Sequence, residues 1–71
     1  MERYDFQVLK DDDTIIAARS VALSDLSEAW PNIAELANSI DEPGCLIRVT
    51  DEAGKVAFLI GVVSARRLSL Q

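Results

Sequence analysis

Few side chains in this 71-residue chain could do chemistry, because it contains one cysteine and no histidine. Three consecutive aspartates, Asp11 to Asp13, offer the oxygen ligands that divalent cations prefer. Their spacing lacks the alternating ligands, the central glycine and the distant glutamate of a calcium-binding loop. We therefore interpret them as a solvated hairpin turn, and Asp51 and Glu52 in the same way, and we predict no metal site.

The scarcity of reactive side chains also disfavours catalysis. A catalytic thiol needs a base beside it, and the absence of histidine removes the commonest one. Cys45 begins a predicted strand, where a lone thiol behaves as a small hydrophobic group in the core. One cysteine excludes an intrachain disulfide and cannot build a structural zinc site. We predict a protein that is not an enzyme and holds no cofactor, and a pocket uniting Asp25, Glu28 and another carboxylate would contradict this.

Composition narrows the class of protein further. Twelve acidic and seven basic residues give a net charge of −5, and 49% of the residues are hydrophobic, as in a globular protein. The acidic balance disfavours nucleic acid, which binds basic surfaces. The chain has no apolar run long enough to span a membrane, and its first residues lack the pattern of a signal peptide. A small acidic cytoplasmic protein of bacterial type is expected.

Two hairpins are predicted to position these residues. Polar and apolar residues alternate from Arg3 to Leu9, the pattern of a half-buried strand, and an aspartate-rich turn leads to a second strand over Thr14–Ala18. Residues 19–23 either extend this strand or form a connector. A second alternating segment runs from Cys45 to Thr50, and after a turn ending at Gly54 a fourth strand covers Lys55–Val63.

One amphipathic helix is expected between the hairpins, over Asp25–Ile40. Asp25 and Glu28 have the spacing of a capping box, and apolar residues follow at intervals of three or four. Pro31 leaves two alternatives open. If Asp25 caps the helix, Pro31 falls in the second turn and a kink near Trp30 is expected. If Ser27 caps it, Pro31 is the fourth helical residue and its missing N–H has no cost.

The elements predict an α+β fold of ββαββ order, with a four-stranded antiparallel sheet and one helix packed on one face. Residues 1–63 form this domain, and residues 64–71 are a C-terminal tail. The alternation assigns one set of side chains to the helix-covered face: Tyr4, Phe6, Val8, Ile47, Val49, Val56, Phe58 and Ile60.

The fourth strand is apolar on both faces, although one helix covers only one side of a sheet. The predicted interface on the uncovered side consists of Leu46, Ala57, Leu59, Gly61 and Val63. Small domains gain little from their cores and commonly add a disulfide, a metal or a second subunit. We therefore expect a homodimer formed through the fourth strand or its outer face, with an unidentified protein partner as another occupant. Alternatively, the tail folds back over this face through Leu68 and Leu70.

Three segments, taken in order, resemble a family of very small proteins from rhizobia and related alphaproteobacteria. They are Arg3 to Phe6 with the following Asp11 to Thr14, Leu23 to Leu26 at the start of the helix, and Arg48 to Val56. The family is catalogued only as a domain of unknown function, and the resemblance covers about residues 3–60. The resemblance implies no catalytic residues.

The leading interpretation is a non-enzymatic protein that acts through protein–protein contacts as a homodimer. The alternative is a regulatory module that binds a small ligand or nucleic acid on the outer sheet face. That alternative requires four basic residues to converge there: Arg3, Arg48, Lys55 and Arg66.

Overall fold

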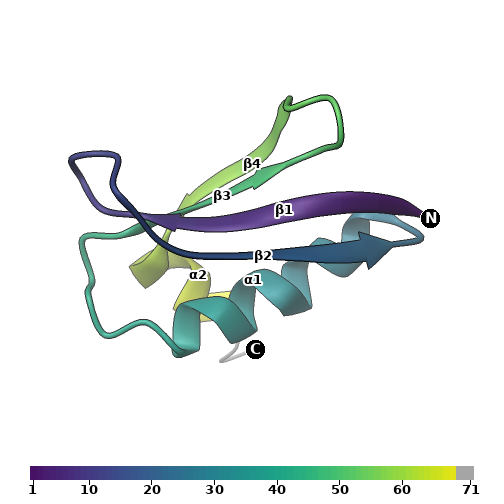
Figure 1. Cartoon of the computed structure of the whole chain (residues 1–71). Helices are drawn as coiled ribbons and strands as arrows, with labels where there is room; N and C mark the ends of the chain where they lie inside the picture. The colour runs from purple at the N-terminus through teal and green to yellow at the C-terminus, as the bar shows by residue number, and fades with distance from the viewer. Residues whose placement is uncertain (69–71) are drawn as a thin grey trace.

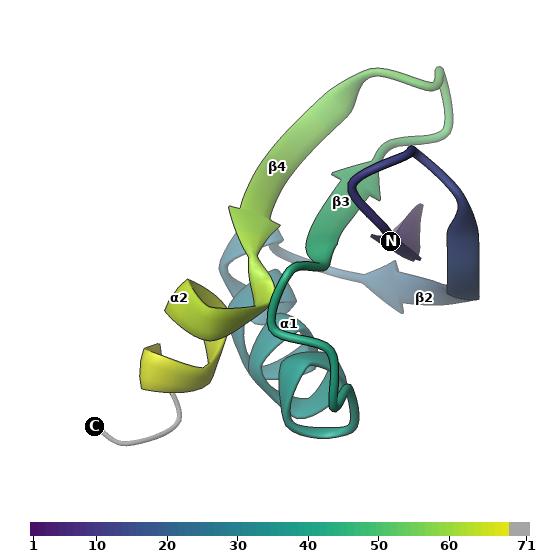
Figure 2. The same ribbon diagram turned by 90° about the vertical axis from the view of Figure 1, so that its left-hand side faces the viewer.

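The computed structural model describes residues 1–68 and forms one sheet with two helices on the same side (Figures 1 and 2). The elements are β1 (Glu2–Leu9), β2 (Ile15–Leu23), the 3₁₀ turn η1 (Leu26–Glu28), α1 (Ala29–Asn38), β3 (Leu46–Thr50), β4 (Val56–Gly61) and α2 (Val62–Leu68). The strand order is β2-β1-β3-β4, and every neighbouring pair is antiparallel. The predicted α+β class and ββαββ order are confirmed, and the short helix α2 is added to the single predicted helix.

The β1–β2 hairpin closes through its aspartate-rich turn. Lys10 N–H donates to Thr14 O over 2.9 Å, and Thr14 N–H donates to Asp12 Oδ1 over 3.1 Å. Asp13 has a φ of 67°, a left-handed conformation that aspartate tolerates better than most residues do. Residues 19–23 extend β2 as far as Leu23, so the first of the two sequence alternatives for this segment holds.

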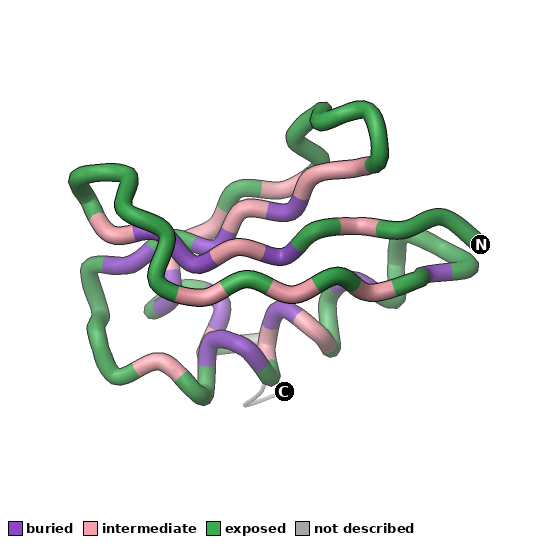
Figure 3. The backbone as a smooth tube through the Cα atoms, in the orientation of Figure 1, coloured by how far each residue is buried: buried purple, intermediate pink, exposed green. Residues whose placement is uncertain are grey.

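The core lies between the sheet and the helix layer. Its central residues are fully buried and come from both layers: Phe6, Val8, Ile33, Ala37, Ile47, Val49, Val62 and Ala65. Figure 3 shows buried positions on the strands and on both helices where the two layers meet. Phe58 and Ile60 of β4 are only half-buried, because they lie at the sheet edge.

The start of the helix accommodates both the capping box at Asp25 and the proline at position 31. Asp25 caps the 3₁₀ turn by accepting from Ser27 N–H over 2.9 Å, and Glu28 completes the capping box by accepting from Asp25 N–H over 2.9 Å. The α-helix then begins at Ala29, so Pro31 is its third residue. An N–H at that position has no partner within a helix, and the proline therefore removes no hydrogen bond.

The predicted C-terminal boundaries of the helix and of the fourth strand are wrong. The α-helix ends at Asn38 instead of Ile40, and β4 ends at Gly61 instead of Val63. Val62 turns into α2 and is fully buried, so the continuous apolar run that predicted a longer strand also contains the start of a helix. Short apolar runs carry no periodicity long enough to separate these cases.

The predicted position of Val56 is also wrong. Thr50 pairs with Val56 while Val49 pairs with Phe58, so Ala57 is an extra residue that forms a β-bulge. The bulge shifts the alternation by one residue and moves Val56 from the helix-covered face to the outer face.

Trp30 is less buried than its place on the apolar side of the helix suggests. Its side chain is 40% exposed, and its ring lies 4.5 Å from that of Phe58, centroid to centroid, at 56°. Among residues 1–68, no helix is long and apolar enough to cross a membrane.

Candidate interaction surface

The outer face of the sheet is uncovered because α1 and α2 lie together on the other side (Figure 2). The strand registers place its side chains in rows across the sheet. One row contains Ile15, Leu9, Leu46 and Gly61, the next contains Ala18, Gln7, Arg48 and Leu59, and the third contains Ser20, Asp5, Thr50 and Val56. Apolar side chains therefore occupy one end of the sheet and the whole outer side of β4.

We define the β4 surface as Leu46, Val56, Ala57, Leu59 and Gly61. Leu59 is 60% exposed and Val56 is 49% exposed, values far above those of core residues. Leu9 lies on the same face but is only 4% exposed, because Ile15 and Leu46 flank it in its row. Exposed apolar side chains thus lie at both edges of the outer face, with Ile15 49% exposed on β2 and Leu59, the most exposed of them, on β4.

Four of the five predicted interface residues lie in or beside this strand. Leu46, Leu59 and Gly61 share the outer face, and Ala57 is the extra residue of the bulge. Val63 is exposed, but it belongs to α2 and not to β4, so its assignment to the outer side of a strand is wrong. Sequence analysis missed Val56, because no local pattern signals the bulge that exposes it.

The C-terminal tail does not cover this face over its described part. Residues 62–68 form α2, which packs against α1 in the helix layer. Leu70 and the side chain of Leu68, the anchors of the alternative in which the tail folds back, lie outside the described residues.

The part of the outer face around Asp5, Gln7, Ser20 and Arg48 is polar and internally bonded. Arg48 donates to Gln7 Oε1 through Nε over 3.1 Å and through Nη2 over 2.7 Å. Ser20 Oγ donates to Asp5 Oδ1 over 2.5 Å, and Arg3 N–H donates to Glu52 Oε1 over 2.9 Å. These bonds satisfy the polar side chains of this part of the face within the chain.

The four basic residues of the nucleic-acid alternative do not converge. Arg3 and Arg48 lie on the outer face, and Lys55 lies in the β3–β4 turn. Arg66 lies in α2, where its Nε donates to Ala37 O of α1 over 3.2 Å. One member of the set is therefore in the helix layer, and the condition stated for that alternative is not met.

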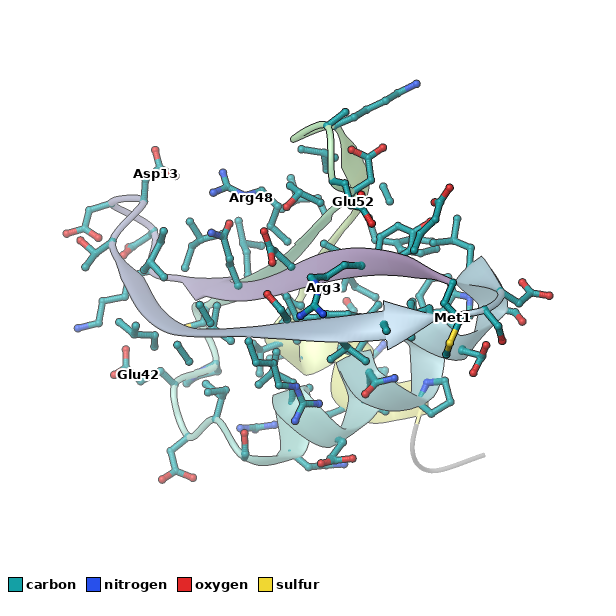
Figure 4. The ribbon with its side chains drawn as sticks, turned by 45° about the vertical axis from the view of Figure 1, so that its right-hand side comes forward. Met1, Arg3, Asp13, Glu42, Arg48 and Glu52 are labelled. Carbon is teal, nitrogen blue, oxygen red and sulfur yellow. The ribbon has the colours of Figure 1, made fainter. Side chains whose placement is uncertain are left out.

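The clustered carboxylates order turns. Hydrogen bonds from Thr14 hold the pKa of Asp12 below its usual value. Asp51 Oδ1 accepts from Ala53 N–H and from Lys55 N–H, each over 2.9 Å. Figure 4 shows Asp13 at the tip of the β1–β2 turn. Within residues 1–68, no three metal-ligating side chains are grouped so that they could hold an ion.

The groups that an enzyme could use have structural partners. Hydrogen bonds from Ser24 and from Asp25 N–H lower the pKa of Glu28. Cys45 is 2% exposed, and its burial, with the nearby Glu42 carboxylate, raises the pKa of the thiol and favours its neutral form. Among residues 1–68, the open hollows near β1, β2 and the β3–β4 turn are lined by neither Asp25 nor Glu28.

No protein-family model, no curated protein and no solved structure matches the chain. The resemblance to the small alphaproteobacterial family has no support from these comparisons.

Proposed function

We propose that this chain is a non-enzymatic, cytoplasmic protein of bacterial type that acts through protein–protein contact as a homodimer, with the β4 surface as the contact region. One observation carries the proposal. β4 is an edge strand that has no charged residue from Val56 to Gly61, and Leu59 at its centre is 60% exposed. An apolar edge of this kind is prone to associate with another chain.

The size of the domain supports association. A 71-residue chain is close to the limit at which one core supplies enough stability, and residues 1–68 contain neither a disulfide nor a grouped metal site that would add to it. A stable dimer buries about 800 Å² per partner. The chain exposes 4472 Å², so burying roughly a fifth of its surface would suffice.

The compartment is proposed from the cysteine. Cys45 is a buried free thiol, and proteins of oxidising compartments commonly pair their cysteines. A reducing cytoplasm is compatible with this state.

The variant Leu59→Glu tests the contact. A carboxylate at this position is solvated in the monomer, because the side chain is mostly exposed, but would be desolvated in the dimer. We expect size-exclusion chromatography to show a monomer for Leu59→Glu at about 100 μM, with the circular dichroism of the folded subunit retained.

Ile15→Glu is the matched control. Ile15 is 49% exposed on the same face but belongs to β2, the opposite edge strand. We expect this variant to remain a dimer. A wild-type protein that is monomeric at about 100 μM would overturn the proposal, as would a Leu59→Glu variant that dimerises like the wild type.

A further inference from the structure

The two edges of the sheet differ in how well they are protected. On the helix side of β2, Arg19 donates through Nη2 to Asn32 O over 3.3 Å and lies 3.6 Å from the Glu35 carboxylate through Nη1. A bulge at Ile16 also interrupts β2 opposite Val8 and Leu9. Inward-pointing charges and bulges are features that keep edge strands from pairing. β4 has no charged residue, and its bulge at Ala57 lies near its start, leaving Leu59 to Gly61 regular.

β4 is apolar on both of its sides. Leu59 and Val56 are exposed on the outer side, while Phe58 and Ile60 on the helix side are only half-buried. Trp30, 40% exposed, packs its ring on Phe58 at this edge. Face-to-face packing of two outer faces would leave the helix side of β4 uncovered. A strand added alongside β4 would place apolar side chains next to those on both of its sides.

The free backbone groups of β4 follow from one hydrogen bond. Val62 N–H donates to Cys45 O over 2.9 Å, directly beyond the Leu46–Gly61 pair. Hydrogen-bonded pairs alternate along an antiparallel ladder, so the backbone groups of Ile60 and Phe58 face β3. Those of Leu59 and Gly61 face away from β3, toward the open edge, along which Figure 2 shows no further strand among the described residues; α2 lies beyond the Gly61 end of β4.

We infer that a second copy of this chain joins along this edge, with the two β4 strands antiparallel and Leu59 on the two-fold axis. This inference rests on the proposed homodimer and specifies its geometry. Leu59 N–H then donates to Leu59 O of the partner subunit, and the bond is repeated in the opposite direction. Phe58 lies opposite Ile60 of the partner subunit on the helix side. A two-fold contact requires such a self-complementary surface, and the result is one continuous eight-stranded sheet.

Amide hydrogen exchange of the wild-type protein tests the geometry without a mutation. In the monomer, the Leu59 amide faces solvent while the Phe58 and Ile60 amides bond to β3. We expect exchange at Leu59 to slow by about tenfold or more from a concentration well below the dimer dissociation constant to one well above it. Phe58 and Ile60 should be protected at both concentrations.

Disulfide trapping gives an independent measurement. In a Cys45→Ala background, Leu59→Cys places the two new thiols on residues whose Cα atoms are about 5.5 Å apart, within disulfide range. The control Ala22→Cys lies on the outer face of β2, at the other edge. In the proposed dimer its two copies are about 30 Å apart, at about 4.8 Å per strand. After mild oxidation, we expect denaturing electrophoresis without reductant to show a crosslinked dimer for Leu59→Cys and no crosslinked dimer for Ala22→Cys.

The outcomes separate the geometry from the proposed function. A wild-type dimer with an unprotected Leu59 amide, or with equal crosslinking of the two cysteine variants, overturns the edge pairing and leaves the homodimer standing. A wild-type protein that stays monomeric at all concentrations overturns both.

Discussion

At the scale of single residues, the charged groups act mainly on local structure. Glu28 accepts hydrogen bonds from Asp25 N–H, from Ser24 N–H and from the Ser24 hydroxyl. Its carboxylate therefore holds the end of β2 against the 3₁₀ turn. Glu28, the carboxylate considered for acid–base chemistry, therefore serves to stabilise the start of the helix.

A pH dependence of stability follows from Glu28. Its folded pKa is lowered, so its contribution is complete above the unfolded value of about 4.3 and is lost as the pH falls through the folded value. We expect the melting temperature to decrease on acidification from about pH 6 to about pH 3 at constant protein concentration. In Glu28→Gln, the decrease should be smaller, and an identical decrease in both proteins would contradict this role. Asp12, whose pKa is also lowered, accounts for part of the remaining decrease.

At the scale of elements, turns and helix starts determine the register of the sheet. Gly54 has a φ of 83° in the β3–β4 turn, where its N–H donates to Asp51 O over 3.0 Å. The left-handed conformation costs a residue with a Cβ about 1–2 kcal/mol. We expect Gly54→Ala to lose about this amount in urea denaturation, although its Cβ would meet no atom within 4 Å. An unchanged midpoint would show that the turn adopts another conformation.

Pro31 distinguishes the two possible helix starts by experiment. As the third residue of α1, it breaks no hydrogen bond and restricts the unfolded chain. We expect Pro31→Ala to lower the free energy of unfolding by about 0.5 kcal/mol. A proline in the second turn would cost about 3 kcal/mol, so a large gain in stability from the same substitution would contradict the observed start at Ala29.

At the scale of the whole molecule, the periodicity of apolar residues was sufficient to predict the fold but not the β4 edge of the sheet. Alternation in residues 3–9 and 45–50, with helical spacing between them, correctly predicts four antiparallel strands and the covering helix. The β4 surface was only partly predictable. The bulge at Ala57 depends on pairing with β3, and the turn of Val62 into α2 depends on burial against α1, neither of which is local to the sequence.

The distribution of polar and apolar groups over the sheet favours association through β4. Both helices cover one face, the polar part of the other face is bonded within the chain, and Leu59, the most exposed large apolar side chain of the sheet, lies on β4. A second copy would pair the free backbone groups of the β4 edge and would contact the apolar side chains on both sides of this strand.

The mass of the wild-type protein in solution tests this most directly. Sedimentation equilibrium over a concentration series up to about 100 μM should show a species of twice the 7.8 kDa chain mass that dissociates on dilution. A single 7.8 kDa species at every concentration would contradict the proposed dimer.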